Sequence, residues 1–217
     1  MTDVIAELGA LRIVPVVEID RVEDAVPLAD ALTAGGLPAI EVTLRTAAAL
    51  DAIGAIAAAR PHFLLGAGTV ITASDAQRAA DAGARFLVSP GLTPTLAAAV
   101  RSIGLPFIPG AVTAGEVIAA VEEGFDLVKF FPAETSGGIA AISALAGPFS
   151  ARGVRFMPTG GIRLANLDAY LESPVVAAVG GTWIANAQHL RDGDFAGITE
   201  RASAALSAVR QSGARAS

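Results

Sequence analysis

The most constraining feature of this sequence is a repeated alternation of two kinds of segment. A short apolar run is followed by an Ala-rich amphipathic stretch and then by a Gly-containing turn, and the unit recurs along the whole chain. Most successive apolar runs begin roughly 20–26 residues apart, which is the length of one strand plus one helix. The pattern predicts strands at residues 13–17, 39–43, 63–66, 86–89, 106–109, 127–130, 155–158 and 175–179.

Alternating strands and helices without a linker-like interruption favour one parallel α/β domain over residues 1–217. Eight such units in a chain of about this length are typical of a closed (β/α)8 TIM barrel, which is the fold we expect. An open doubly wound sheet is the alternative. The Gly-x-Gly-x-x-Gly turn that commonly follows the first strand of dinucleotide-binding sheets is missing, because residues 14–18 lead directly to Asp20.

Composition excludes several classes of function. The chain has 53% hydrophobic and 17% charged residues, so it can bury a large core, and its net charge of −6 argues against nucleic-acid binding. It contains no cysteine and two histidines, so we expect no disulfide and no metal cofactor. No apolar run reaches the ~18 residues of a membrane span. Asp3 and Glu7 do not suit a secretory leader, so we expect a cytoplasmic protein without membrane partners.

Lys129 is the only lysine in the chain, and it lies inside the apolar run at 127–130. Burial disfavours an ammonium, and a lysine kept neutral in this way is a candidate nucleophile toward a carbonyl. A side chain that extends to solvent is the alternative.

The second predicted strand, at 39–43, carries Glu41 inside an apolar run, and Arg45 follows it four residues later. Burial of Glu41 would favour its protonated form and suit it to proton transfer, whereas pairing with Arg45 or another charge is the alternative. The Arg45 guanidinium can bind a substrate carboxylate through two hydrogen bonds, or lie in solvent. Because a barrel gathers its chemistry at the carboxyl ends of its strands, we expect these side chains to meet Lys129 there.

Two glycine pairs follow the last two strands, Gly160-Gly161 and Gly180-Gly181. Loops at these two places in barrels often bind phosphate through backbone N–H groups. The pairs therefore indicate an anion site, although glycine pairs are also common in turns.

Together these segments resemble the 2-keto-3-deoxy-6-phosphogluconate (KDPG) aldolase family, which also covers 4-hydroxy-2-oxoglutarate (KHG) aldolases. The resemblance extends over residues 13–184. The two specific motifs are Glu-Val-Thr-Leu-Arg at 41–45 and Lys-Phe-Phe-Pro-Ala at 129–133. Residues 66–70, 89–92, 158–162 and 180–183 add to it.

The resemblance implies a class I, metal-free lyase that forms a Schiff base with its substrate and is usually a homotrimer. Lys129 would form the Schiff base and Glu41 would be the general acid and base. Arg45 would bind the pyruvate carboxylate close to Thr69, and Pro90 and Phe131 would pack around the pyruvyl group. The sugar and phosphate end would be lined by Thr159, Gly160, Gly161, Gly181 and Thr182.

The resemblance also implies pyruvate and a phosphorylated keto acid as ligands. Thr182 departs from the Ser that the family often has there, and Arg163 departs as well, so the preferred epimer and phosphate pose stay open. A sugar-phosphate isomerase or epimerase is one alternative, since it would use the same loops and a Glu base. A barrel that binds a sugar phosphate without catalysis is another.

Overall fold

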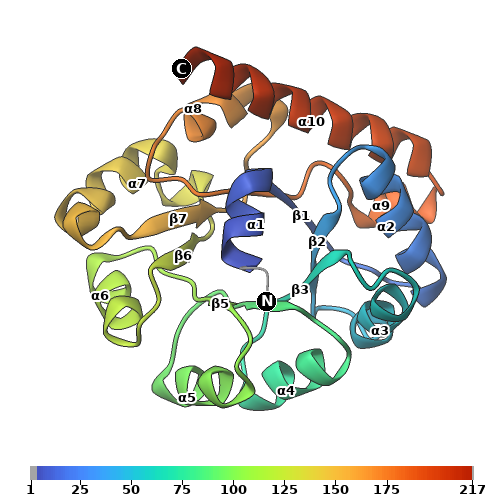
Figure 1. Cartoon of the computed structure of the whole chain (residues 1–217), viewed down its shortest axis with the longest axis horizontal. Coiled ribbons are helices and arrows are strands. Elements are labelled where there is room, and N and C mark those ends of the chain that lie inside the picture. Colours follow the sequence, from blue (N-terminus) through green and yellow to red (C-terminus); the bar gives the residue numbers. More distant parts are fainter. Residues whose placement is uncertain (1–3, 217) are drawn as a thin grey trace.

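The computed structural model describes residues 4–216. Asp3, which was used above to argue against a secretory leader, lies outside the described residues. Within residues 4–216, eight parallel strands alternate with helices. Figure 1 shows these elements arranged around a ring. The strands are β1 (Ile13–Val17), β2 (Ala39–Thr43), β3 (Leu64–Gly68), β4 (Phe86–Val88), β5 (Phe107–Ile108), β6 (Leu127–Phe130), β7 (Arg155–Pro158) and β8 (Val179–Gly181).

The helices lie outside the strands, except for the first. They are α1 (Val4–Leu11), α2 (Ala25–Ala34), α3 (Ala49–Ala59), α4 (Ala73–Asp81), α5 (Pro94–Ile103), α6 (Ala114–Glu122), α7 (Gly138–Ala146), α8 (Leu167–Leu171), α9 (Ala187–Arg191) and α10 (Phe195–Ala216). Capping boxes begin α4 at Thr72 and α6 at Thr113, where each side-chain hydroxyl accepts the N–H three residues on. No helix within residues 4–216 is long and apolar enough to cross a membrane.

The expected closed (β/α)8 TIM barrel is wrong, because the hydrogen-bonded ladders form two parallel sheets. One sheet has six strands in the order β5-β4-β3-β2-β1-β8, and the other consists of β6 and β7. Only isolated bridges link the two sheets, Gly110 with Lys129 on one side and Phe156 with Val176 and Thr159 with Gly180 on the other.

The break between β5 and β6 has a simple origin in proline. Pro106 and Pro109 flank the two residues of β5, and a proline has no N–H to donate to a ladder. What remains is a single paired residue: the Lys129 N–H donates to Pro109 O at 2.7 Å and the Ala111 N–H donates to Lys129 O at 2.9 Å.

The break between β7 and β8 comes from a change of register. The step from Phe156 to Thr159 is one residue shorter than the step from Val176 to Gly180, so one extra residue interrupts the ladder, as in a bulge. The apolar run at 175–179 therefore contributes one bridge, and the strand begins at Val179 rather than at residue 175.

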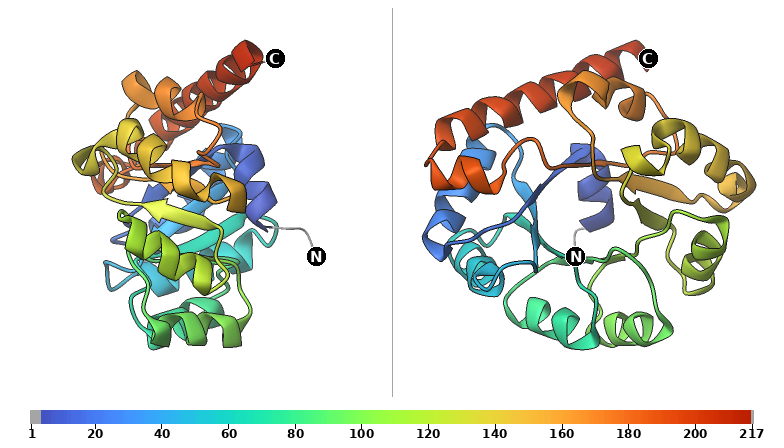
Figure 2. Two further views of the ribbon diagram at one scale, coloured as in Figure 1. Left: turned by 90° about the vertical axis from the view of Figure 1, so that its left-hand side faces the viewer. Right: turned by 180° about the vertical axis from the view of Figure 1, so that it is seen from behind.

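The core has an outer and an inner part. The outer part lies between the strands and the surrounding helices, where small Ala side chains allow close packing. The inner part fills the ring near the start of the strands, where Leu8 of α1 packs with Leu64, Leu127 and other inward side chains. Figure 2 shows α1 on one side of the ring, so one end of the interior is covered and the other is left for a site.

The loops after β6 and β7 are held together by Glu134 and Tyr170. The Glu134 N–H donates to Gly160 O at 3.1 Å, and the Glu134 carboxylate accepts a hydrogen bond from the hydroxyl of Tyr170, which is 1% exposed. Burial, followed by the neighbouring carboxylate, raises the pKa of Tyr170 above its usual value.

Close strand packing gives the first prediction. The ring of Phe86 lies over Gly66, where an added Cβ would be 2.2 Å from the ring. We expect Gly66→Ala to lower the free energy of unfolding by about 1–3 kcal/mol, as overpacking of a core does. Thermal and denaturant unfolding would measure the change. The matched control is Gly115→Ala in α6, where an added Cβ meets nothing within 4 Å. Equal stability of the wild type and Gly66→Ala would contradict this packing.

Tyr170 gives the second prediction, because it is the only tyrosine in the chain. Its raised pKa means that the unfolded chain loses the phenolic proton near pH 10 while the folded chain keeps it. The free energy of unfolding should therefore fall as the pH rises above about 10, and phenolate absorbance should appear only as the protein unfolds. In Tyr170→Phe this part of the pH dependence should vanish. An ordinary titration in the folded protein would disprove the buried contact.

Candidate active site

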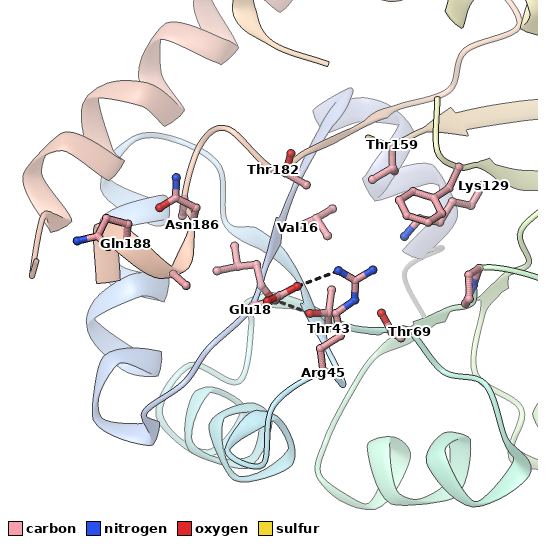
Figure 3. Close-up of a pocket in the computed structure, with 15 residues that line it drawn as sticks. Val16, Glu18, Thr43, Arg45, Thr69, Lys129, Thr159, Thr182, Asn186 and Gln188 are labelled. Atoms are coloured by element: carbon pink, nitrogen blue, oxygen red, sulfur yellow. Dashed lines mark hydrogen bonds and ion pairs between the residues drawn. The ribbon is translucent and has the colours of Figure 1, made fainter. Parts of the chain in front are cut away.

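A cavity of about 430 Å³ opens at the carboxyl ends of the strands, the end away from α1. Seven of the eight strands or the loops directly after them contribute to its wall, so the ring converges on one site (Figure 3). The lining residues are Val16, Val17, Glu18, Thr43, Arg45, Thr69, Pro90, Lys129, Phe131, Thr159, Thr182, Ala185, Asn186, Ala187 and Gln188.

Lys129 reaches this cavity from inside the ring. Its residue is 6% exposed, so the side chain does not extend to solvent, and its Nζ donates to Glu41 Oε1 at 2.9 Å. The Nζ also lies 5.4 Å from the ring centroid of Phe131. Its environment is therefore one carboxylate, one aromatic face and the cavity.

Glu41 lies behind Lys129, fully buried, and does not line the cavity itself. Its Oε2 has no hydrogen-bond partner among the described residues. A Cβ at Gly68 of β3 would be 2.0 Å from Oε1, so glycine is required there for the carboxylate to fit. A buried carboxylate with one partner and one free oxygen can accept or return a proton at Nζ.

Arg45 does not pair with Glu41. Its Nη1 donates to Glu18 Oε1 at 2.8 Å, and both side chains are about half exposed, at 48% and 42%. Because the guanidinium lines the cavity, its remaining N–H groups can bind an anion inside it.

Two threonines add hydroxyl groups to the wall. Thr159 is buried and its Oγ1 has no partner within the part of the chain described, while a Cβ at Gly180 would be 2.0 Å from that oxygen. Thr69 holds a left-handed backbone with φ 59°, a conformation that non-glycine residues keep mainly where the surroundings enforce it. Gly180 of β8 therefore leaves the room that the Thr159 hydroxyl occupies, and the backbone of Thr69 sets the direction of its side chain.

The glycine pairs lie at the edge of the site. Gly160 and Gly161 have positive φ, 101° and 79°, and a Cβ at Gly161 would be 2.7 Å from the Glu134 side chain. Neither they nor Gly181 line the cavity, whereas Thr182 does. Among the described residues no acceptor takes the N–H of Gly161 or of Thr182, so both remain available to a ligand.

The structure thus brings seven of the predicted residues together around one cavity: Arg45, Thr69, Pro90, Lys129, Phe131, Thr159 and Thr182. Sequence reasoning missed the apolar wall from β1 and the polar side chains of Asn186 and Gln188. It allowed Glu18, at the end of the first strand, to line the site but gave it no chemical role. A sequence signal for Asn186 existed, because Asn is a favoured residue at the start of a helix. In the structure its side chain accepts the His189 N–H at the start of α9, beside the site. Within residues 4–216 no group of three or more acidic or histidine side chains could hold a metal ion.

Comparison with known proteins identifies the family of the chain. The family model for KDPG and KHG aldolase matches residues 4–201. The 2-dehydro-3-deoxy-phosphogluconate aldolase of Treponema pallidum is 50% identical over 92% of this chain and 94% of its own length. The KHG/KDPG aldolase of Escherichia coli is 45% identical over 91% of this chain and 92% of its own.

Solved structures give the same result. The KDPG aldolase of Legionella pneumophila, with pyruvate captured at low pH as a covalent carbinolamine, has a TM-score of 0.90 and 41% identity over 94% of this chain and 98% of its own. The KDPG aldolase of Zymomonas mobilis with 3-phosphoglycerate has a TM-score of 0.86 and 41% identity over 93% and 94%. With a family match over nearly its whole length, the chain belongs to the KDPG and KHG aldolase family.

Proposed function

We propose that this chain is a class I aldolase that cleaves 2-dehydro-3-deoxy-6-phosphogluconate to pyruvate and glyceraldehyde 3-phosphate. We propose that it also cleaves 4-hydroxy-2-oxoglutarate to pyruvate and glyoxylate. The observation that carries the proposal is the 2.9 Å contact between Lys129 Nζ and Glu41 Oε1 beside a cavity of substrate size. The names of relatives at 44–50% identity support the activity.

Lys129 is the proposed nucleophile. Transfer of a proton from its Nζ to Glu41 Oε1 leaves a neutral amine, which attacks the C2 ketone of the substrate and forms a carbinolamine. The carbinolamine hydroxyl takes this proton from Glu41 and leaves as water, which gives an iminium and returns Glu41 to its carboxylate form. The covalent carbinolamine in the Legionella relative is the species that this step predicts.

Glu41 is the proposed general base and acid. It removes the proton of the C4 hydroxyl, in our proposal through a water molecule, because the carboxylate lies behind Lys129 rather than on the cavity wall. The C3–C4 bond then breaks, the aldehyde leaves, and the electron pair moves into the iminium to give an enamine. Proton return to C3 and hydrolysis release pyruvate and restore Lys129. The iminium is the electron sink, so the reaction needs no metal or organic cofactor.

The remaining residues would position the substrate. Arg45 binds the carboxylate, with Thr69 close by, and Pro90 and Phe131 pack against the pyruvyl carbon atoms. The phosphate end would meet the Thr159 hydroxyl, the Gly160-Gly161 loop and the Gly181-Thr182 turn. The free N–H groups of Gly161 and Thr182 support an anion there.

We further propose a homotrimer that acts in the cytoplasm in the Entner–Doudoroff breakdown of sugar acids. Exposed Ile71 and Ile118, at 60% and 48%, support a subunit interface. Membrane and nucleic-acid partners have no place in this proposal.

Trapping of the Schiff base is the direct test. Incubation with pyruvate followed by borohydride should add one reduced pyruvyl group to Lys129, seen by mass spectrometry of intact and digested protein. Lys129 is the only lysine, so the N-terminal amine is the only other primary amine to exclude. Lys129→Arg keeps the charge and should form no adduct. An unmodified Lys129 in the wild type would favour the isomerase, epimerase or binding-protein alternatives.

The role of Glu41 is tested by Glu41→Gln, which keeps the size of the side chain and removes the proton carrier. We expect kcat to fall by ~10²–10⁴. The Lys129 adduct should still form, but more slowly. Glu122→Gln, an exposed position on α6, is the matched control and should keep its activity. A kcat within a few-fold of the wild type would remove Glu41 from the mechanism.

A further inference from the structure

One carboxylate lines the cavity, and the proposed reaction does not use it. Glu18 directly follows β1, lines the cavity, and accepts a hydrogen bond from Arg45 Nη1 at 2.8 Å, as the dashed line in Figure 3 shows. Arg45 is the group proposed to bind the carboxylate of the substrate. Glu18 therefore offers Arg45 the same chemical group as the ligand does.

We propose that Glu18 is an internal competitor for Arg45 that weakens the binding of every 2-keto acid and shortens the retention of pyruvate. The inference rests on the proposed function, because it needs Arg45 to bind the substrate carboxylate. Glu18 touches the ligand-binding group rather than the reacting atoms, so it is an affinity-determining residue and not a catalytic one.

The strands hold the two partners in reach of each other. Val16 and Val17 of β1 pair in register with Glu41 and Val42 of β2, so the strand ends that carry Glu18 and Arg45 are neighbours. The Thr43 hydroxyl donates to Val17 O at 3.4 Å and ties these ends together. The parallel pairing of β1 with β2 therefore places Glu18 and Arg45 close to each other.

Arg45 is the basic side chain of the cavity wall that is available to pair with Glu18. The only basic side chains among the lining residues are Arg45 and Lys129, and Lys129 is buried against Glu41. A ligand carboxylate that binds Arg45 must displace Glu18 or share the guanidinium with it. In either case part of the positive charge is already neutralised, and the two carboxylates repel each other.

The exposure of the pair sets the size of the effect. An ion pair with both side chains nearly half exposed is a weak one, so its loss should change ligand affinity by about two- to fivefold. A competitor of this strength is displaced by the substrate, which also forms a covalent bond to Lys129, and it returns to Arg45 when pyruvate leaves.

The test compares wild type with Glu18→Gln. The pyruvate concentration that gives half-maximal borohydride-trapped adduct on Lys129 should fall by about two- to fivefold in the variant. The methyl ester of pyruvate has the same ketone without the charge, and its half-saturating concentration should not change. Asp20→Asn is the matched control, since Asp20 pairs with Arg191 at the surface and does not line the cavity.

A double-mutant cycle assigns the effect to Arg45. In the Arg45→Gln background, Glu18→Gln should no longer lower the half-saturating pyruvate concentration. An unchanged or raised value for Glu18→Gln in the otherwise native protein would overturn the inference, and so would an equal gain for the methyl ester. Circular dichroism would confirm that each variant is folded. The absence of any adduct in the wild type would overturn the proposed function as well, so the two failures are distinguishable.

Discussion

The contact between Lys129 and Glu41 is the interaction on which the rest of the site depends. Lys129 belongs to the two-stranded sheet and Glu41 to the six-stranded sheet, so the contact crosses the interior of the ring and joins the two sheets. Both groups lose their hydration there, and each is tolerated because the other is present. In the proposed mechanism these two groups are the nucleophile and its proton carrier, and the fold keeps them together at the cost of burying both.

Room for these groups comes from glycine on the neighbouring strands. Gly68 leaves space for the Glu41 carboxylate, and Gly180 leaves space for the Thr159 hydroxyl, each where a Cβ would be 2.0 Å from the oxygen concerned. In both cases a buried polar side chain on one strand faces a glycine on the neighbouring strand. Glycines at the strand ends thus serve two purposes, since Gly160 and Gly161 shape the loop after β7, while Gly68 in β3 and Gly180 in β8 leave room for neighbouring polar groups.

Much of the fold follows from local pattern, but its closure does not. The runs at 13–17, 39–43, 127–130 and 155–158 became strands with the predicted bounds. The first three contain β-branched residues, which favour strands, and the fourth is a short run whose Phe156 and Met157 are buried. The run at 175–179 was misplaced, since the register between β7 and β8 depends on hydrogen bonds across the ring. The closed barrel was wrong partly for the same reason, although Pro106 and Pro109 on either side of β5 were a local signal that a ladder could end there. In the site, the burial of Lys129 and Glu41 could be predicted from their apolar neighbours. The pairing of Arg45 with Glu18 could not, because it depends on which strands are adjacent.

Two ion pairs lie at the cavity, and they differ in their exposure to solvent. Lys129 and Glu41 are buried, whereas Arg45 and Glu18 are about half exposed. The pair of Lys129 and Glu41 is shut away from water, so breaking it without chemistry would leave an uncompensated buried charge. The pair of Arg45 and Glu18 is open to solvent, so water and ligand can replace either partner at little cost. A keto acid carries both a carbonyl and a carboxylate. In the proposed mechanism the carboxylate binds at the exposed pair, which opens easily, and the carbonyl reacts at the buried pair, which opens only by proton transfer. Recognition can therefore be reversible and weak while the reacting groups stay in place.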